Sequence, residues 1–331
     1  MELYIFNRDL EPQGIIEGYD SLRWVRRYSQ CGEFELQTAL TASNLKLLQQ
    51  ENIIYKKDDT EAGVINYINY KLDTDGKEII VVKGKFATGY LNRRITLGAN
   101  TITDTAENIM RILLNDNAIN PTDSNRTISN LILGVNNGFT ENASYTLDNK
   151  ELLEDIENIA ALAELGIRTD FDITDKKLVF NLYKGLNRSL NQTTNPRAVF
   201  SKEFQNILEQ EYIGSNNNYK NVAYGNSTSL GNATGLDRFE IYTNNDLDVE
   251  LSKRPKITTF DSKINLNSNL KYKVAFDLGD IVTFESKKWG IVIDTRITEI
   301  EEVYEQDGLS INVVFGNSIP TLIDKIKKEI K

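Results

Sequence analysis

A strand segment that follows an Asp-Gly turn occurs twice in the chain. Residues 75–84 read DGKEIIVVKG and residues 307–316 read DGLSINVVFG, so six of the ten positions agree without a gap. An Asp-Gly pair tolerates the positive φ angles of a tight hairpin turn, and Val and Ile favour strands. Two shorter matches lie upstream at nearly equal spacing, 52–54 with 280–282 and 63–65 with 290–292. Asp-Gly hairpins also occur in β proteins without duplication, but the ordered matches favour two related β modules.

Between the two modules the hydrophobic period changes from that of strands to that of helices. Apolar residues fall on one helical face in 106–114 and again in 152–163, which predicts two amphipathic helices. Asp104 and Asp148 each precede a glutamate three positions on, which is a helix start signal, and Gly166 is placed to end the second helix. The pattern predicts an α+β domain inserted into β structure.

These patterns together predict a mainly β chain with an α+β insert. The predicted segments are a first β module at 1–95, an inserted α+β domain at 96–195, a return segment of the first module with an exposed loop at 196–240, a second β module at 241–316 and a C-terminal helix at 317–331. A helix this short is marginal alone in water, so its apolar side should bind a sister subunit or another protein. The predicted interface residues are Ile319, Leu322, Ile323, Ile326 and Ile330.

The chain contains no histidine and a single cysteine, Cys31. Without histidine, Ser-His-Asp and Cys-His centres and every histidine-based zinc site are excluded, and we predict no metal site and no cofactor. One cysteine cannot form an intrachain disulfide, so packing must hold the fold. The net charge of −10 argues against specific nucleic-acid binding, which needs clustered Lys and Arg. The first residues contain too short an apolar run for a signal peptide or a membrane span, so we expect no membrane insertion.

Paired carboxylates are the catalytic groups that remain for a hydrolase such as a glycosidase. Asp277 with Asp280, or Glu301 with Glu302, are the candidate pairs. With 48 acidic residues in the chain, close pairs arise by chance, and these lie at a predicted turn and on a predicted strand face. We therefore assign no catalytic residue.

Two other patterns have a functional and a structural interpretation. Residues 170–175 resemble a calcium loop but lack its glycine and its final acidic residue, so a turn between strands is favoured. Trp24 and Trp289 could stack on a ligand, but large aromatics in alternating runs are more often core residues. We predict that both tryptophans are structural.

Three ordered parts of the sequence resemble the baseplate or tail-tip hub proteins of long-tailed phages and of related contractile tail-like particles. The first, 24–36, reads WVRRYSQCGEFEL, in which an aromatic, arginine-rich strand turns through Gly-Glu-Phe-x-Leu. The second, 200–207, is similar to the family's return strand after its inserted domain. The third is similar to the family's C-terminal signature and comprises 272–282, 296–300 and 313–316. The resemblance spans most of the chain.

This resemblance implies a specific architecture and role. It implies two tube-forming β-barrel domains, an inserted α+β domain, and a homotrimer whose six barrels form a ring. Such a ring adapts a sixfold tail tube to a threefold tail tip and forms part of the channel for DNA or the tape measure. The implied partners are a tail tube or distal tail protein, the tape measure protein, and a tip spike or fibre protein. The implied location is the tail tip of a virion or of a bacteriocin-like particle, assembled in the bacterial cytoplasm.

Two other classes of function remain as alternatives. A tail-associated endopeptidase or muralytic enzyme is the first, and the missing histidine, the lone cysteine and the lack of a catalytic module weigh against it. A secreted β-rich adhesin is the second, and the expected absence of a signal peptide disfavours it. We predict a structural protein rather than an enzyme.

Overall fold

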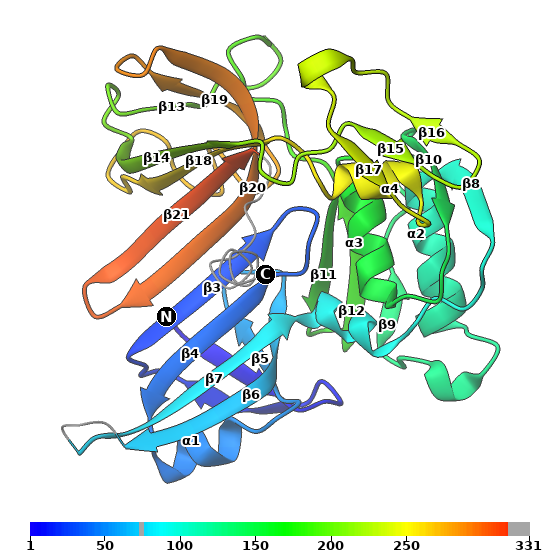
Figure 1. Ribbon diagram of the computed structural model, residues 1–331. Coiled ribbons are helices and arrows are strands. Elements are labelled where there is room, and N and C mark those ends of the chain that lie inside the picture. The colour runs from blue at the N-terminus through cyan, green and yellow to red at the C-terminus, as the bar shows by residue number, and fades with distance from the viewer. Residues whose placement is uncertain (73–75, 317–331) are drawn as a thin grey trace. The chain divides into compact units, whose positions relative to one another are not determined.

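The computed structural model describes residues 1–72 and 76–316 (Figure 1). Strands account for 44% and helices for 16% of the described residues, which confirms a mainly β protein. The chain divides into two compact units. Unit 1 contains Met1–Lys184 and Glu301–Ser310, and unit 2 contains Gly185–Ile300 and the segment from Ile311.

The first part of unit 1 is an antiparallel sheet. Its elements are β1 (Leu3–Phe6), β2 (Pro12–Ile16), β3 (Ser21–Arg27), β4 (Glu33–Ala39), α1 (Ala42–Leu47), β5 (Ile53–Lys56), β6 (Ala62–Leu72) and β7 (Glu78–Phe86). The hydrogen-bonded order is β3-β4-β7-β6-β5-β1-β2, and β3, β4, β7 and β6 run side by side in Figure 1. Trp24 pairs with Phe34 across β3 and β4, and both side chains are buried. Alternate residues of β4 are buried along its whole length, as a period of two requires.

The rest of unit 1 is an α+β segment. Its elements are η1 (Ala87–Arg93), β8 (Thr101–Thr105), α2 (Ala106–Leu114), η2 (Asn115–Ile119), η3 (Ser124–Arg126), β9 (Leu131–Leu133), β10 (Asn142–Thr146), α3 (Leu152–Leu162), β11 (Gly166–Asp172) and β12 (Lys177–Tyr183). The two predicted helices are present, and α2 packs against α3. β12 pairs antiparallel with β11 and parallel with β9.

The ends of the two helices differ from the prediction. Thr105, not Asp104, caps α2, because its hydroxyl accepts a hydrogen bond from the Asn108 amide. α3 ends where Glu164 adopts a positive φ of 52°, and the next amide donates back to the Ala160 carbonyl. Gly166 therefore opens β11 and does not end the helix.

Among the described residues, unit 2 contains further strands of the main 13-stranded sheet and a small peripheral sheet. Its elements are β13 (Val199–Ser201), β14 (Ile207–Ser215), β15 (Val222–Tyr224), β16 (Ser229–Leu230), η4 (Gly235–Asp237), β17 (Glu240–Tyr242), α4 (Leu247–Ser252), β18 (Ile257–Ile264), β19 (Ile281–Ser286), β20 (Ile291–Glu305) and β21 (Gly308–Gly316). The main order is β14-β18-β21-β20, with β19 also on β20. The predicted return segment, 196–240, contributes β14, which pairs with β18. The five segment boundaries predicted from the sequence stay predictions.

Two predictions are limited by what the structure describes. No closed barrel is found, and the strands of residues 1–72 and 76–316 form open sheets, so the barrel architecture is not confirmed. Residues 317–331 lie outside the described part, and with them the predicted C-terminal helix and its interface residues Ile319, Leu322, Ile323, Ile326 and Ile330. Among the described helices, none is long and apolar enough to cross a membrane.

Candidate assembly site

The two units contain the same order of strands. In unit 1 the order is β3-β4-β7-β6-β5, and in unit 2 it is β14-β18-β21-β20-β19. In unit 1, β4 of the β3–β4 pair lies next to β7, the last strand of the β5-β6-β7 meander. In unit 2, β18 of the β14–β18 pair lies next to β21, the last strand of the β19-β20-β21 meander. In the sequence, an Asp-Gly pair lies between the last two strands of each meander, and the glycines Gly76 and Gly308 have φ values of 78° and 113°. The strand order supports the duplication that the sequence suggested.

The tip of the β20–β21 hairpin is bound on β3 of unit 1. Residues Glu301–Ser310 belong to unit 1, and β20 is the neighbour of β3 in the sheet order. The guanidinium group of Arg23 on β3 forms an ion pair with Glu301 and lies 3.3 Å from Glu33. The hairpin tip thereby covers the edge of β3, whose backbone N–H and C=O groups would otherwise stay unpaired.

A buried lysine fixes this hairpin tip. The Nζ atom of Lys56, on β5, lies 2.7 Å from Oε2 of Glu302 and 3.4 Å from Oδ2 of Asp59. The side chains of all three residues are at most 2% exposed. The same Asp59 oxygen accepts a hydrogen bond of 3.1 Å from Nε1 of Trp24. A buried ammonium group is thus held between two carboxylates that come from distant parts of the chain.

Two aromatic rings enclose the Lys56 ammonium group. Its Nζ lies 5.9 Å from the ring centre of Trp24 and 5.7 Å from that of Tyr304, within the range of cation–π attraction. The Tyr304 hydroxyl donates a 2.6 Å hydrogen bond to Glu302, and burial raises the pKa of Tyr304 above its usual value. We name Trp24, Lys56, Asp59, Glu302 and Tyr304 the lysine cluster.

The counterparts of β20 and β3 in the repeated order are β6 and β14, and each of these has an open edge among the described residues. β6 pairs with β5 only through Ala62–Val64, so the outer edge of its second half has no strand partner there. β14 stands at the end of the strand order, so one of its edges is also open. Leu208 and Tyr212 on β14 are 47% and 45% exposed. The second half of β6 exposes three large apolar side chains by 49–68%: Tyr67, Tyr70 and Leu72.

These two open edges carry opposite charges. Lys71 on β6 is exposed and forms no ion pair within the described residues. On β14, Glu211 is likewise unpaired there, and Glu209 has only a 4.0 Å contact with Lys263. Side chains alternate between the faces of a strand. On β14, the exposed Leu208 and Tyr212 therefore lie on one face and Glu209 and Glu211 on the other. On β6, Tyr70 and Leu72 lie on the face opposite Lys71.

A family model described as "Siphovirus ReqiPepy6 Gp37-like protein" matches residues 2–244 and 236–317. These two matches span nearly the whole chain. The chain belongs to this siphovirus tail protein family. A comparison with curated proteins found no match.

The fold of this family member is similar to that of three solved tail proteins. The prophage tail protein gp18 from Listeria monocytogenes EGD-e is 14% identical, with 99% of each chain covered and a TM-score of 0.57. The tail protein from Neisseria meningitidis MC58 is 10% identical, with 95% of each chain covered and a TM-score of 0.57. The 43 kDa tail protein of prophage MuSo2 from Shewanella oneidensis is 10% identical, covers 95% of this chain and 96% of its own, and has a TM-score of 0.58. The resemblance to phage tail proteins found in the sequence is confirmed.

The candidate acidic pairs all have structural partners in this family member. Asp280 is 3% exposed and accepts hydrogen bonds from the Leu186 amide at 2.7 Å, from Nε of Arg188 at 2.8 Å and from the Asp277 amide at 3.0 Å. It therefore anchors the strand entry at residue 281. Glu301 and Glu302 hold the hairpin tip, as described above.

The calcium-like segment and the tryptophans give mixed outcomes. The Asp172 carboxylate accepts from the amides of Thr174 and Asp175, which makes the predicted turn between β11 and β12. Within the described residues, no group of His, Cys, Asp or Glu is arranged to hold a metal ion. Trp24 is buried as predicted, but Trp289 is 39% exposed, so its prediction as a core residue is wrong.

Sequence reasoning did not single out the lysine cluster. Lys56 lies two residues after the buried Ile54, so the alternation of β5 directs both side chains to the same side of the sheet. A lysine at an inward position signals a buried acidic partner, because an unpaired buried charge is costly. The partner Glu302 could not be found this way, because it lies 246 residues away.

Proposed function

We propose that this chain is a structural hub subunit of a phage tail tip, forms a homotrimer, and adapts a sixfold tail tube to a threefold tip. The observation that carries the proposal is the repeated strand order, in which β20 lies on β3 while the described second half of β6 and one edge of β14 have no strand partner among the described residues. Three chains with two similar modules each supply the six modules that a sixfold neighbour requires. The ring encloses part of the channel for DNA or the tape measure.

The ring closes when the open edge of β6 binds the next copy in the same way that β20 binds β3 within one chain. The β6–β7 tip would then lie along β14 of the neighbouring copy, as the β20–β21 tip lies along β3. Strand addition satisfies the open backbone groups of both edges. Lys71 would face the acidic side of β14, near Glu209 and Glu211, while Tyr70 and Leu72 would meet the apolar groups of β14 on the other face. Such a head-to-tail contact forms a closed ring when its rotation closes.

Further tail components bind the rim of this ring. The proposed partners are a tail tube or distal tail protein on one side, a spike or fibre protein on the other, and the tape measure protein in the channel. The predicted C-terminal helix serves as an additional attachment element. Its removal is expected to leave the β content unchanged and to weaken assembly.

We further propose that the protein is not an enzyme. Support comes from the nominated carboxylates, each of which takes part in a structural hydrogen bond or ion pair. A dye-release assay on peptidoglycan should show no activity. Activity that is abolished by one carboxylate substitution would favour the alternative, a tail-associated endopeptidase or muralytic enzyme.

The ring contact is tested by reversing charges. We expect the purified protein, or its complex with a neighbouring tail protein, to contain three 37.6 kDa chains by light scattering. Lys71→Glu should shift the mass toward the monomer because it opposes two acidic residues, and Glu211→Lys in the same chain should restore the trimer. Lys46→Glu on α1 makes the same charge change at an exposed site and should leave the mass unchanged.

Two results would contradict this assembly. The first is a chain that stays monomeric alone and with its tail neighbours at every concentration. The second is a trimer that Lys71→Glu and Lys46→Glu affect equally.

A further inference from the structure

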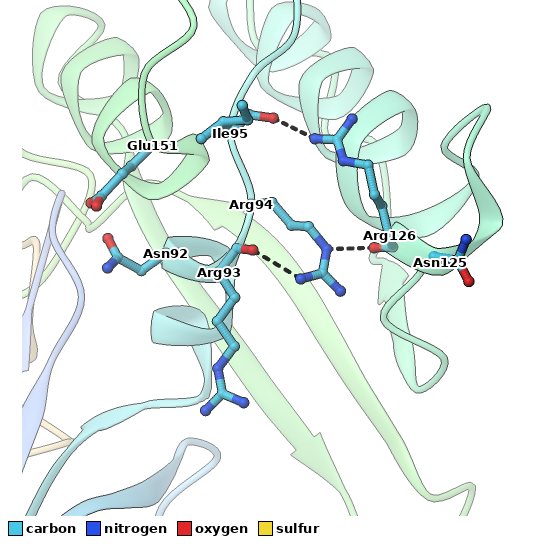
Figure 2. A pocket seen from close by; sticks show the side chains of 7 residues that line it. All are labelled: Asn92, Arg93, Arg94, Ile95, Asn125, Arg126 and Glu151. Carbon is cyan, nitrogen blue, oxygen red and sulfur yellow. Dashed lines mark hydrogen bonds between the residues drawn. The ribbon is translucent and has the colours of Figure 1, made fainter.

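An arginine-rich pocket lies in unit 1, where the chain passes from the sheet to the α+β segment. Its volume is about 300 Å³, at the lower end of the range for small-molecule sites. Figure 2 shows the side chains that line it. They are Asn92, Arg93, Arg94, Ile95, Asn125, Arg126 and Glu151.

Two of the three arginines have no acidic partner in the described residues. Arg93 is neutralised by a two-pronged contact with Glu51, with distances of 2.7 and 2.9 Å. Arg94 and Arg126 form no ion pair there. The carboxylate of Glu151, although it lines the pocket, points away from both of these guanidinium groups (Figure 2). The pocket therefore contains two uncompensated positive charges.

Backbone carbonyl groups hold both guanidinium groups in place. Arg94 donates through Nε to the carbonyl of Arg126 and through Nη1 to that of Arg93, the latter at 2.9 Å. Arg126 donates through Nη2 to the carbonyl of Ile95 and, at 3.3 Å, to Oδ1 of Asn117. The two side chains thus cross between η1 and η3 (Figure 2). Because they are already ordered, little rotamer entropy is lost when a ligand binds.

Several donors remain for a ligand. A guanidinium group carries five N–H donors. Nη2 of Arg94, and Nε and Nη1 of Arg126, have no acceptor among the described residues. The Asn92 side chain is exposed on the same rim and also forms no hydrogen bond there. These groups match an oxyanion with several acceptor oxygens.

Like charges meet at this pocket within an acidic protein. Burial, together with the positive charges of Arg126, Arg93 and Arg8, lowers the pKa of Arg94 below its usual value. An arginine stays charged even so, and the repulsion is relieved by a bound anion. The whole chain has a net charge of −10, so this positive site belongs to an acidic protein.

We propose that this pocket binds a phosphate group. A phosphate monoester or inorganic phosphate carries close to two negative charges at neutral pH, which equals the two uncompensated arginine charges. Its oxygens can accept from both guanidinium forks at once, the geometry for which arginine is suited. A single carboxylate has one charge and two oxygens and would leave one arginine unpaired. The proposal is independent of the hub function, since it rests on unit 1 alone.

The test is a titration of the full-length protein with inorganic phosphate at constant ionic strength, followed by ³¹P line broadening and by calorimetry. We expect saturable binding that is weakened by about tenfold or more in Arg94→Gln/Arg126→Gln. The control is Arg238→Gln, which removes a surface arginine in unit 2 and should bind like the parent. Circular dichroism verifies the fold of each variant.

Additional variants and ligands cover the case in which the double variant does not fold and identify the source of the phosphate group. If the double variant does not fold, Arg94→Lys keeps the charge but loses the planar fork, and it should still bind severalfold less tightly. Glycerol 3-phosphate and dimethyl phosphate distinguish a terminal phosphate from a phosphodiester chain as the source of the group. Binding that is absent, equal in the double variant, or equalled by acetate at the same concentration would overturn the proposal.

Discussion

Replacing Lys56 by methionine tests whether the lysine cluster holds the β20–β21 hairpin tip. Methionine preserves most of the apolar stem of lysine but removes the buried ammonium group. Glu302 is then left 1% exposed without the cation that lies 2.7 Å away in the parent. Asp59 is affected less, because it keeps hydrogen bonds from Nε1 of Trp24 and from the Thr60 amide.

The expected loss follows from the burial of the pair. Removing one partner of a buried ion pair costs about 3–5 kcal/mol, because the other charge stays in a site of low polarity. The hydroxyl of Tyr304 continues to donate to Glu302, so we expect the lower end, about 3 kcal/mol. The neighbour Lys57 is the matched control, since its side chain is 60% exposed and its partner Glu2 is 43% exposed. Lys57→Met should barely change stability.

The measurement is urea unfolding followed by Trp24 and Trp289 fluorescence and by circular dichroism. Adding Glu302→Gln to the Lys56→Met variant removes the stranded charge, so it should restore stability by more than about 1 kcal/mol. Coinciding midpoints for Lys56→Met and Lys57→Met would refute the argument. So would a double variant that is less stable than Lys56→Met.

Two further predictions follow from the turn and from a buried acid. Gly308→Val should lower the free energy of unfolding by about 1–2 kcal/mol through backbone strain alone, because φ is 113° and an added Cβ meets no atom within 4 Å. Gly18→Val is the control, since Gly18 is also in open space but has no positive φ. Equal melting temperatures of the two variants would argue against the turn. Burial raises the pKa of Glu61 to about 8, so the native state binds its proton more tightly than the unfolded chain does. Its contribution to stability is complete below about pH 4.5 and is lost as the pH rises through about 8. Glu61→Gln should therefore flatten the fall of the unfolding midpoint across this window, and parallel pH profiles would count against the assignment.

Local patterns in the sequence determined the strands, the helices and the turns. The DGxxIxVVxG repeat predicted two hairpins because the positive φ of a glycine and the alternation of side chains are properties of a few neighbouring residues. The apolar stripes predicted α2 and α3 for the same reason. Errors appeared where neighbours compete, as when Thr105 rather than Asp104 caps α2.

Only the tertiary structure decided which strand edges are covered and which charges are paired. The contact of Lys56 with Glu302 joins residues 246 positions apart, and the sequence showed only an inward lysine. Arg94 and Arg126 are likewise 32 positions apart, and no spacing rule relates them. The exposure of a side chain also depends on the tertiary structure, since Trp289 lies in a run of sequence typical of a strand and is nevertheless 39% exposed. Periodicity specifies what a segment becomes, because it acts through local geometry. Pairing between segments depends on the register and packing of the whole sheet, which no short stretch of sequence contains.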